Sequence, residues 1–197
     1  SWAAVQLIDL RRVHEYLDIA FGLLDDQSID RAGEIDLIRG VRINVLVEEG
    51  HLTEALTCEN FTDQSHNSPN GLAQFAASQA AWMKGDMITA RSLADGAVEQ
   101  LGAFDAFNAS PFVLAGSALL AFVTGDTKRG QADIESSIAR GGGTGMWDHL
   151  WLARARAWAE VHAGRPEVAV AALLEGVQEG SKTSRCGWSA LGLHDAV

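Results

Sequence analysis

The stretch ASQAAWMKGDMITARSLADGAV, residues 77–98, decides the fold that we expect for this chain. One apolar segment with a period near 3.6 residues ends at Gly85, and a second begins directly after Asp86. Glycine suits the left-handed residue that closes a helix, and aspartate at the next position can cap the helix that follows. The stretch therefore predicts two helices joined by a tight turn.

The same kind of turn recurs along the chain, as Gly50-His51, Gly85-Asp86, Gly125-Asp126 and Gly164-Arg165. Successive glycines are 35, 40 and 39 residues apart, which is close to one helix pair per repeat. Small residues fill eleven of the twelve positions at three offsets: seven before, five after and twelve after each glycine. These positions are Ile43, Ser78, Ala118 and Ala157, then Ala55, Ala90, Gly130 and Ala169, then Thr62, Ala97, Ser137 and Gly176. Because small side chains allow close approach, they predict where antiparallel helices cross.

The whole chain reads as helices of this kind, and no strand pattern is visible. The predicted helices cover 2–24, 29–49, 51–60, 70–84, 86–102, 110–124, 126–140, 146–163, 165–178 and 183–196. The loops between them are short, so we predict a single all-α domain over residues 1–197.

Composition limits the classes of partner. The net charge of −11 and the pI of about 4.8 argue against direct nucleic-acid contact, because acidic surfaces repel phosphate backbones. The apolar run 112–123 is too short to cross a bilayer. Two distant cysteines, Cys58 and Cys186, make no disulfide framework, so we expect a cytoplasmic protein.

At the stretch quoted above, the chain resembles a degenerate tetratricopeptide (TPR) repeat, which implies a right-handed superhelix of about ten helices. Degenerate, acidic and Ala/Gly-rich repeats also resemble the middle region of large LuxR-family transcriptional regulators of the MalT type. The segment 190–197, ALGLHDAV, looks like one common in actinobacterial members. The resemblance implies a fragment of a larger protein, a sensor or regulatory region for an effector or protein partner. Its DNA-binding helix-turn-helix would lie outside this segment.

No residue pattern indicates a catalytic, cofactor or metal site. The loop Gly141–Gly145 lacks the lysine of a phosphate-binding loop, and we interpret it as a connection between helices. No two of the six histidines have a ligand spacing. The acidic residues Asp25, Asp26, Asp30, Glu34 and Asp36 read as a solvated loop, since no EF-hand spacing appears. An α-helical enzyme built from scattered Asp and His remains an alternative.

The turn glycines also predict a binding surface. In TPR-like arrays the first helix of each pair lines the concave side, and offsets of thirteen, ten, six and three residues before each glycine share one helix face. That face collects aromatic side chains with a few polar ones among them. We predict a partner groove formed by Asn44, Phe75, Gln79, Trp82, Phe112, Phe122, Trp151, Arg154 and Trp158. Apolar stripes more often form core, so core packing is the main alternative.

Two further interpretations stay open. The repeats are equally consistent with a TPR-like adaptor, or with a regulatory region joined to a kinase or cyclase. Trp188, Leu191 and Leu193 give the predicted helix 183–196 an apolar surface, and a homodimer through this helix is the second interpretation.

Overall fold

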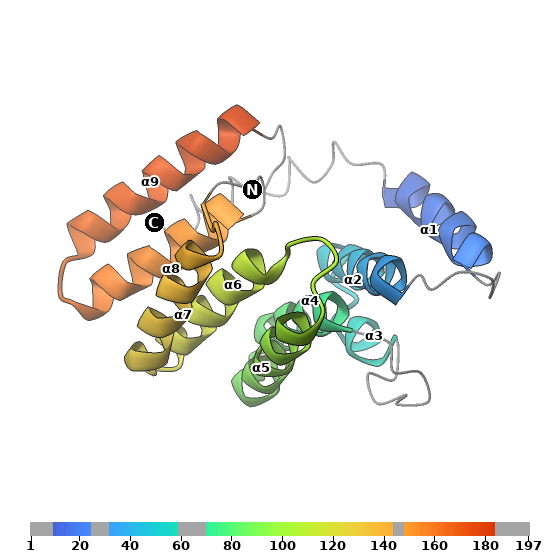
Figure 1. Cartoon of the computed structure of the whole chain (residues 1–197), viewed down its shortest axis with the longest axis horizontal. Coiled ribbons are helices and arrows are strands. Elements are labelled where there is room, and N and C mark those ends of the chain that lie inside the picture. The colour runs from blue at the N-terminus through green and yellow to red at the C-terminus, as the bar shows by residue number, and fades with distance from the viewer. Residues whose placement is uncertain (1–9, 25–31, 59–69, 144–147, 184–197) are drawn as a thin grey trace. The chain divides into compact units, whose positions relative to one another are not determined.

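The computed structural model describes residues 10–24, 32–58, 70–143 and 148–183 (Figure 1). Every regular element within these ranges is a helix, which confirms the predicted all-α class. Nine helices are described: α1 (Leu10–Leu24), α2 (Ala32–Glu48), α3 (Leu52–Thr57), α4 (Gly71–Met83), α5 (Met87–Ala103), α6 (Ser110–Val123), α7 (Thr127–Ala139), α8 (Asp148–His162) and α9 (Pro166–Thr183).

The observed bounds follow the predicted ones closely, with one clear difference. Helix α9 continues to Thr183 instead of ending at 178, because a single internal glycine such as Gly180 weakens a helix by only about 1 kcal/mol. The predicted helix 183–196 lies almost wholly outside the described residues. None of the helices in the described ranges combines the length and apolar character that a bilayer crossing requires.

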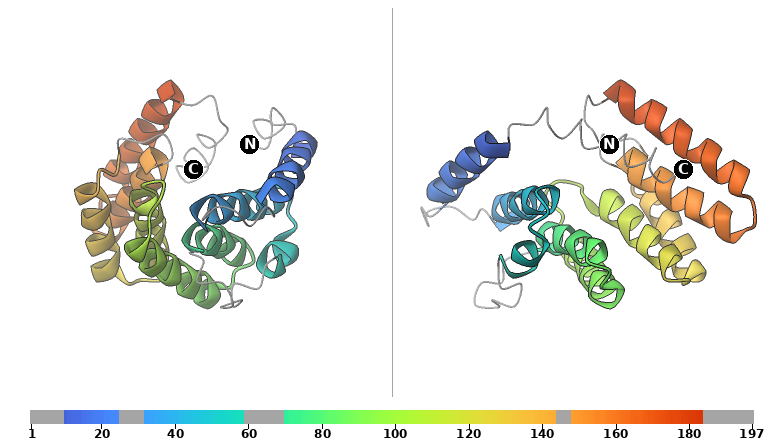
Figure 2. Two further views of the ribbon diagram at one scale, coloured as in Figure 1. Left: turned by 45° about the vertical axis from the view of Figure 1, so that its right-hand side comes forward. Right: turned by 180° about the vertical axis from the view of Figure 1, so that it is seen from behind.

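The described helices fall into two compact units, which we treat separately. The N-terminal unit holds α1–α5, and the C-terminal unit holds α6–α9. In the former, α2 packs against α3 and α4, and α4 packs along α5. In the latter, α6 packs against α7 and α8, and α8 lies beside α9 (Figure 2). Each unit thus contains two consecutive helix pairs whose first helices touch.

The four turn glycines close their helices as predicted. Their φ angles are all positive, +81° at Gly50, +80° at Gly85, +84° at Gly125 and +74° at Gly164. Each glycine amide donates to the carbonyl three residues earlier, and the next amide donates to the carbonyl five residues before it, at 2.8–3.0 Å. These two bonds define a Schellman motif, which satisfies carbonyls that the helix end leaves without partners.

The two turn aspartates cap the helices that follow them. The carboxylate of Asp86 accepts a hydrogen bond from the amide of Thr89 at 3.0 Å, and Asp126 accepts one from the amide of Arg129 at 3.1 Å. Capping at both positions was predicted from the sequence and is confirmed.

The small residues at the three offsets lie where helices cross. All eleven positions within the described residues are buried, and Thr62 falls outside them. A Cβ added to Gly130 would lie 2.7 Å from the ring of Phe122, and one added to Gly176 would overlap the Cβ of Ala153. These contacts join α7 to α6 and α9 to α8, so the close approach that the sequence predicted is confirmed.

Asp36 corrects one expectation, because it does not belong to a solvated loop. It lies within α2, is only 3% exposed, and accepts hydrogen bonds from the amides of Leu72 and Ala73, each at 3.0 Å. Those amides start α4, where backbone donors have no partner inside the helix. Asp36 therefore caps α4 from the neighbouring helix. Glu34 is also helical, and the other three acidic residues lie outside the described ranges.

Candidate binding surface

The nine predicted groove residues divide into two sets by exposure. Four are buried: Phe75, Phe122, Trp151 and Arg154. Five are half-buried: Asn44, Gln79, Trp82, Phe112 and Trp158. Since a partner can reach only side chains that retain some exposure, the second set is the one that a groove would use. The groove itself stays a prediction.

In the C-terminal unit, the half-buried Phe112 and the buried Trp151 and Arg154 stack where α6 packs against α8. The rings of Phe112 and Trp151 meet edge to face, with centroids 5.9 Å apart and planes at 87°. The guanidinium carbon of Arg154 lies 4.9 Å from the centroid of Trp151, within the range of a cation–π contact. Trp151 and Arg154 are 3% and 6% exposed. These three side chains therefore pack between helices, as expected if the aromatic residues form core instead of a groove.

His162 joins the same two helices at their other end, and the sequence analysis missed it. Its Nε2 donates a hydrogen bond to the carbonyl of Phe122 at 2.8 Å, so this nitrogen carries the hydrogen. Its ring lies 5.8 Å from that of Phe122 and 6.3 Å from that of Trp158. This carbonyl lies in the last turn of α6 and also accepts a hydrogen bond from the amide of Gly125, so His162 is its second donor. No local pattern marks a residue 40 positions away as its partner.

In the N-terminal unit, α4 carries Phe75, Gln79 and Trp82 along one side. Phe75 is 2% exposed, whereas the other two keep part of their surface accessible. The side-chain nitrogen of Gln79 is buried and makes no hydrogen bond within the part of the chain that the structure describes. Burying an amide hydrogen without an acceptor costs about 1–3 kcal/mol.

The accessible face of α2 is turned relative to the face that the glycine offsets mark. Gly40 and Val47 are buried, while Leu37 and Val41 are exposed and Asn44 is half-buried. At 3.6 residues per turn, this is a rotation of roughly 50°. The cause is the contact between α2 and α4, because a Cβ added to Gly40 would lie 3.3 Å from Leu72.

Two exposed aromatic residues follow α5 and were also missed by the sequence analysis. Phe104 and Phe107 are 46% and 47% exposed. A Cβ added to Gly33, near the start of α2, would lie 3.4 Å from Phe104 and 3.6 Å from Phe107. Both rings thus gather beside one point of α2, far from them in sequence.

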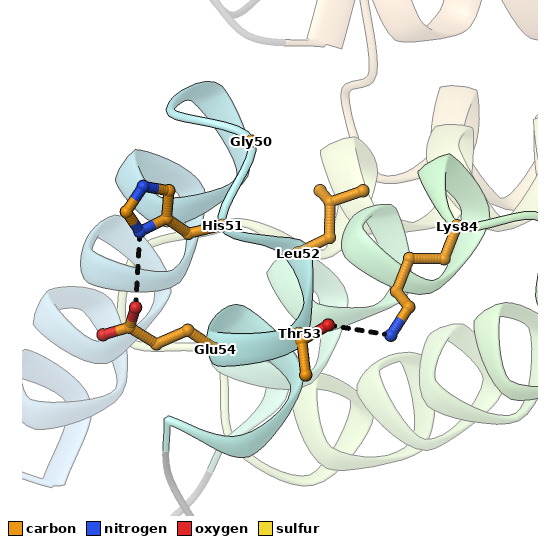
Figure 3. Close-up of a pocket in the computed structure, with 6 residues that line it drawn as sticks. All are labelled: Gly50, His51, Leu52, Thr53, Glu54 and Lys84. Carbon is orange, nitrogen blue, oxygen red and sulfur yellow. Dashed lines mark hydrogen bonds and ion pairs between the residues drawn. The ribbon is translucent and has the colours of Figure 1, made fainter.

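An open hollow in the N-terminal unit is lined by Gly50, His51, Leu52, Thr53, Glu54 and Lys84 (Figure 3). His51 Nδ1 lies 3.3 Å from a carboxylate oxygen of Glu54, and Lys84 donates to the hydroxyl of Thr53 at 3.1 Å. The polar side chains are exposed and pair with each other across the hollow. They do not converge on a point where a ligand would sit.

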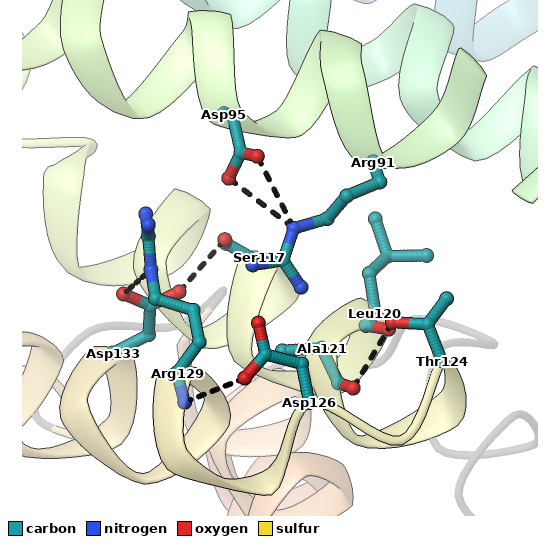
Figure 4. A network of polar contacts seen from close by, with 9 residues as sticks. All are labelled: Arg91, Asp95, Ser117, Leu120, Ala121, Thr124, Asp126, Arg129 and Asp133. Carbon is teal, nitrogen blue, oxygen red and sulfur yellow. Dashed lines mark hydrogen bonds and ion pairs between the residues drawn. The ribbon is translucent and has the colours of Figure 1, made fainter. Parts of the chain in front are cut away.

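A buried polar network in the C-terminal unit has a structural role. The hydroxyl of Ser117 donates to one carboxylate oxygen of Asp133 at 2.9 Å, and Nε of Arg129 donates to the other at 2.8 Å (Figure 4). Asp133 is 5% exposed, and both of its oxygens are satisfied. The network therefore ties α6 to α7 and presents no activated nucleophile.

The glycine-rich loop and the side chains able to bind metal ions offer no further site within the described residues. Gly141 and Gly142 end α7, with amides donating to the carbonyls of Ile138 and Ser137, so the described part of the loop connects helices as predicted. Within the described ranges, no three His, Cys, Asp or Glu side chains gather closely enough to hold a metal ion. His66, His194 and Cys186 lie outside those ranges.

Comparison of the chain with protein-family models, with curated proteins and with solved structures finds no match.

Proposed function

We propose that this chain is a non-catalytic binding module, a TPR-like right-handed superhelix that receives an effector or protein partner on the faces of its first helices. One observation carries the proposal. Within each unit, the first helices of successive pairs pack on each other, α2 on α4 and α6 on α8. Stacked pairs of this kind are typical of repeat arrays, which use one extended side for binding.

The side chains of α4 support this function in the N-terminal unit. Trp82 offers a partly accessible aromatic surface, and tryptophan is among the residues that contribute most to binding energy. One helical turn earlier, Gln79 is half-buried and adds a polar amide to the same side of α4. An apolar surface beside a partly accessible amide side chain fits a peptide backbone or a small polar effector.

We further propose that the module belongs to the regulatory region of a LuxR-type transcriptional regulator in the cytoplasm, with DNA binding carried by a separate helix-turn-helix. The support is the resemblance of the degenerate acidic repeats. The coding sequence that follows codon 197 tests this placement. A basic helix-turn-helix there would support it, whereas a kinase or cyclase domain would favour the alternative regulatory role.

The binding function itself can be tested by selecting peptides from a random display library on the 197-residue chain. We expect saturable binders whose affinity falls at least about tenfold when Trp82→Ala is introduced. The neighbouring Met83→Ala is the matched control, because Met83 is exposed and points to another side of α4. Circular dichroism should show unchanged helicity for both variants. A library that yields no saturable binder, or binders indifferent to Trp82→Ala, would refute the proposal.

A further inference from the structure

An exposed apolar feature outside the predicted groove residues lies where the loop after α5 meets α2. Phe104 and Phe107 both lie against Gly33 and keep nearly half of their surfaces in solvent. Leu37 and Val41 follow Gly33 at intervals of four residues and are each 38% exposed. Residues four apart are neighbours on a helix face, so the apolar surface continues for two turns along α2. We name Leu37, Val41, Phe104 and Phe107 the α2 ridge.

Local hydrogen bonds stabilise the loop that carries the two phenylalanines. Asp105 accepts a hydrogen bond from the amide of Ala109 at 2.7 Å, and Asn108 adopts a left-handed backbone with φ of +53°. The amide of Phe104 donates to the carbonyl of Gln100 at 2.9 Å. A partner would therefore meet rings that are already positioned, which lowers the entropic cost of binding.

Among the described residues of α2, the charged side chains on the side of the α2 ridge are acidic. Glu34 lies beside its start and is exposed, and Glu48 lies on the same side of α2 beyond Val41. The basic residues of this helix, Arg39 and Arg42, project away from that side by helix geometry. Burial raises the pKa of the Glu48 carboxyl, so a nearby cation would offset an existing desolvation cost.

We propose that the α2 ridge is a docking surface for an amphipathic helical segment of another protein, with an apolar face and lysine or arginine at its ends. Apolar side chains would pack against the exposed rings, Leu37 and Val41, and the basic ends would lie near Glu34 and Glu48. This inference rests on the proposed binding function and names the chemistry of one partner. It shares Leu37 with the face that the turn glycines mark, but Val41, Phe104 and Phe107 lie outside that face.

A second copy of this chain fits the ridge less well than a basic partner. A symmetric dimer through the ridge would place Glu34 and Glu48 of one copy against the same carboxylates of the other. Each copy also carries a net charge of −11. Like charges brought together in this way cost binding energy, whereas a basic helix gains from the same field.

Three fluorescein-labelled peptides of about 18 residues, the length of a short amphipathic helix, test the proposal. The first has leucines at helical spacing and two lysines at each end. The second replaces these lysines by glutamates, and the third keeps the composition of the first but scrambles the leucines. Fluorescence anisotropy with the 197-residue chain should show the first peptide binding at least about tenfold more tightly than the other two, and less tightly as salt is raised.

The variants place this binding on the ridge. The double substitution Phe104→Ser and Phe107→Ser should weaken the lysine peptide by at least about tenfold. Val41→Lys should weaken it too, while improving the relative affinity of the glutamate peptide. Ile88→Ser is the matched control, because Ile88 is 86% exposed in the same unit but lies outside the ridge. It should leave binding unchanged, and all variants should keep their helicity.

Two outcomes would overturn the proposal. Equal affinity for the lysine and glutamate peptides would refute the charge argument. Unchanged binding in both the double phenylalanine variant and Val41→Lys would refute the location. If library-selected peptides still depend on Trp82, only this inference fails; if no peptide of any kind binds, the proposed function fails with it.

Discussion

Replacing Gly85 with alanine should destabilise the N-terminal unit by about 1 kcal/mol. The φ angle of Gly85 is +80°, and a Cβ added there meets no heavy atom within 4 Å. The cost is therefore conformational, about 1–2 kcal/mol for a left-handed residue with a Cβ. Alanine also restricts the unfolded chain, which offsets about 0.4–1 kcal/mol of this cost.

Gly102→Ala is the matched control, because Gly102 also has open space around its Cβ position but lies within α5 without a positive φ. This substitution should stabilise the same unit by about 0.5 kcal/mol. Urea denaturation followed by circular dichroism measures both changes as opposite shifts of the midpoint at an unchanged slope. Gly85→Asn should fall between wild type and Gly85→Ala, because asparagine tolerates the left-handed region better.

The reasoning would be refuted if Gly85→Ala matched the stability of the wild type. It would also be refuted if Gly85→Ala and Gly102→Ala shifted the midpoint in the same direction. Either result would mean that the recurring glycine serves something other than the backbone conformation of the turn.

Three further predictions concern packing and buried charge. Gly130→Ala should cost about 1–3 kcal/mol in thermal denaturation, because the added carbon would lie 2.7 Å from the ring of Phe122; a negligible loss would contradict the close crossing of α6 and α7. Asp36→Ala should cost about 2 kcal/mol in urea denaturation, because it removes the acceptor of two amides at the start of α4, and wild-type stability would contradict this capping role. Glu48→Gln should raise the melting temperature at about pH 7. It should not raise it at about pH 3, where the carboxyl is protonated in both the folded and the unfolded chain. Burial raises the pKa of this carboxyl above its usual value, so the folded state favours the protonated form. The stability that protonated Glu48 contributes is complete at low pH and is lost as the pH rises through the folded-state pKa. Equal gains at both pH values would contradict that assignment.

Much of the fold could be predicted from the sequence because its signals are local. The Schellman bonds at Gly85 and the cap at Asp86 connect residues no more than five positions apart. Their geometry depends on backbone conformation and short side chains, which the residue types already specify. The buried small residues at fixed offsets follow from the same periodicity. The turn glycine and its Schellman bonds recur at all four turns, and the aspartate cap recurs at two of them, so the helix-pair organisation could be predicted from the sequence.

The candidate binding surface was less predictable, because exposure depends on what packs against each helix. The glycine offsets placed Trp82, Gln79 and Asn44 on partly accessible faces, but the same offsets selected Trp151 and Phe122, which are buried. The same offsets from the turn glycine, applied to every helix, cannot distinguish a partly accessible residue from a buried one. Each helix has different neighbours, and those neighbours decide which part of a face stays in solvent.

The sequence by itself determined the helical class, the pairing of successive helices and the turns that join them, because each rests on interactions within a few residues. Only the tertiary structure decided that Asp36 caps α4, that His162 donates to a carbonyl of α6, and that Phe104 and Phe107 gather beside Gly33. These contacts join residues from 36 to more than 70 positions apart in the chain. No local propensity specifies such distant partners, and they form only when packed helices bring them together.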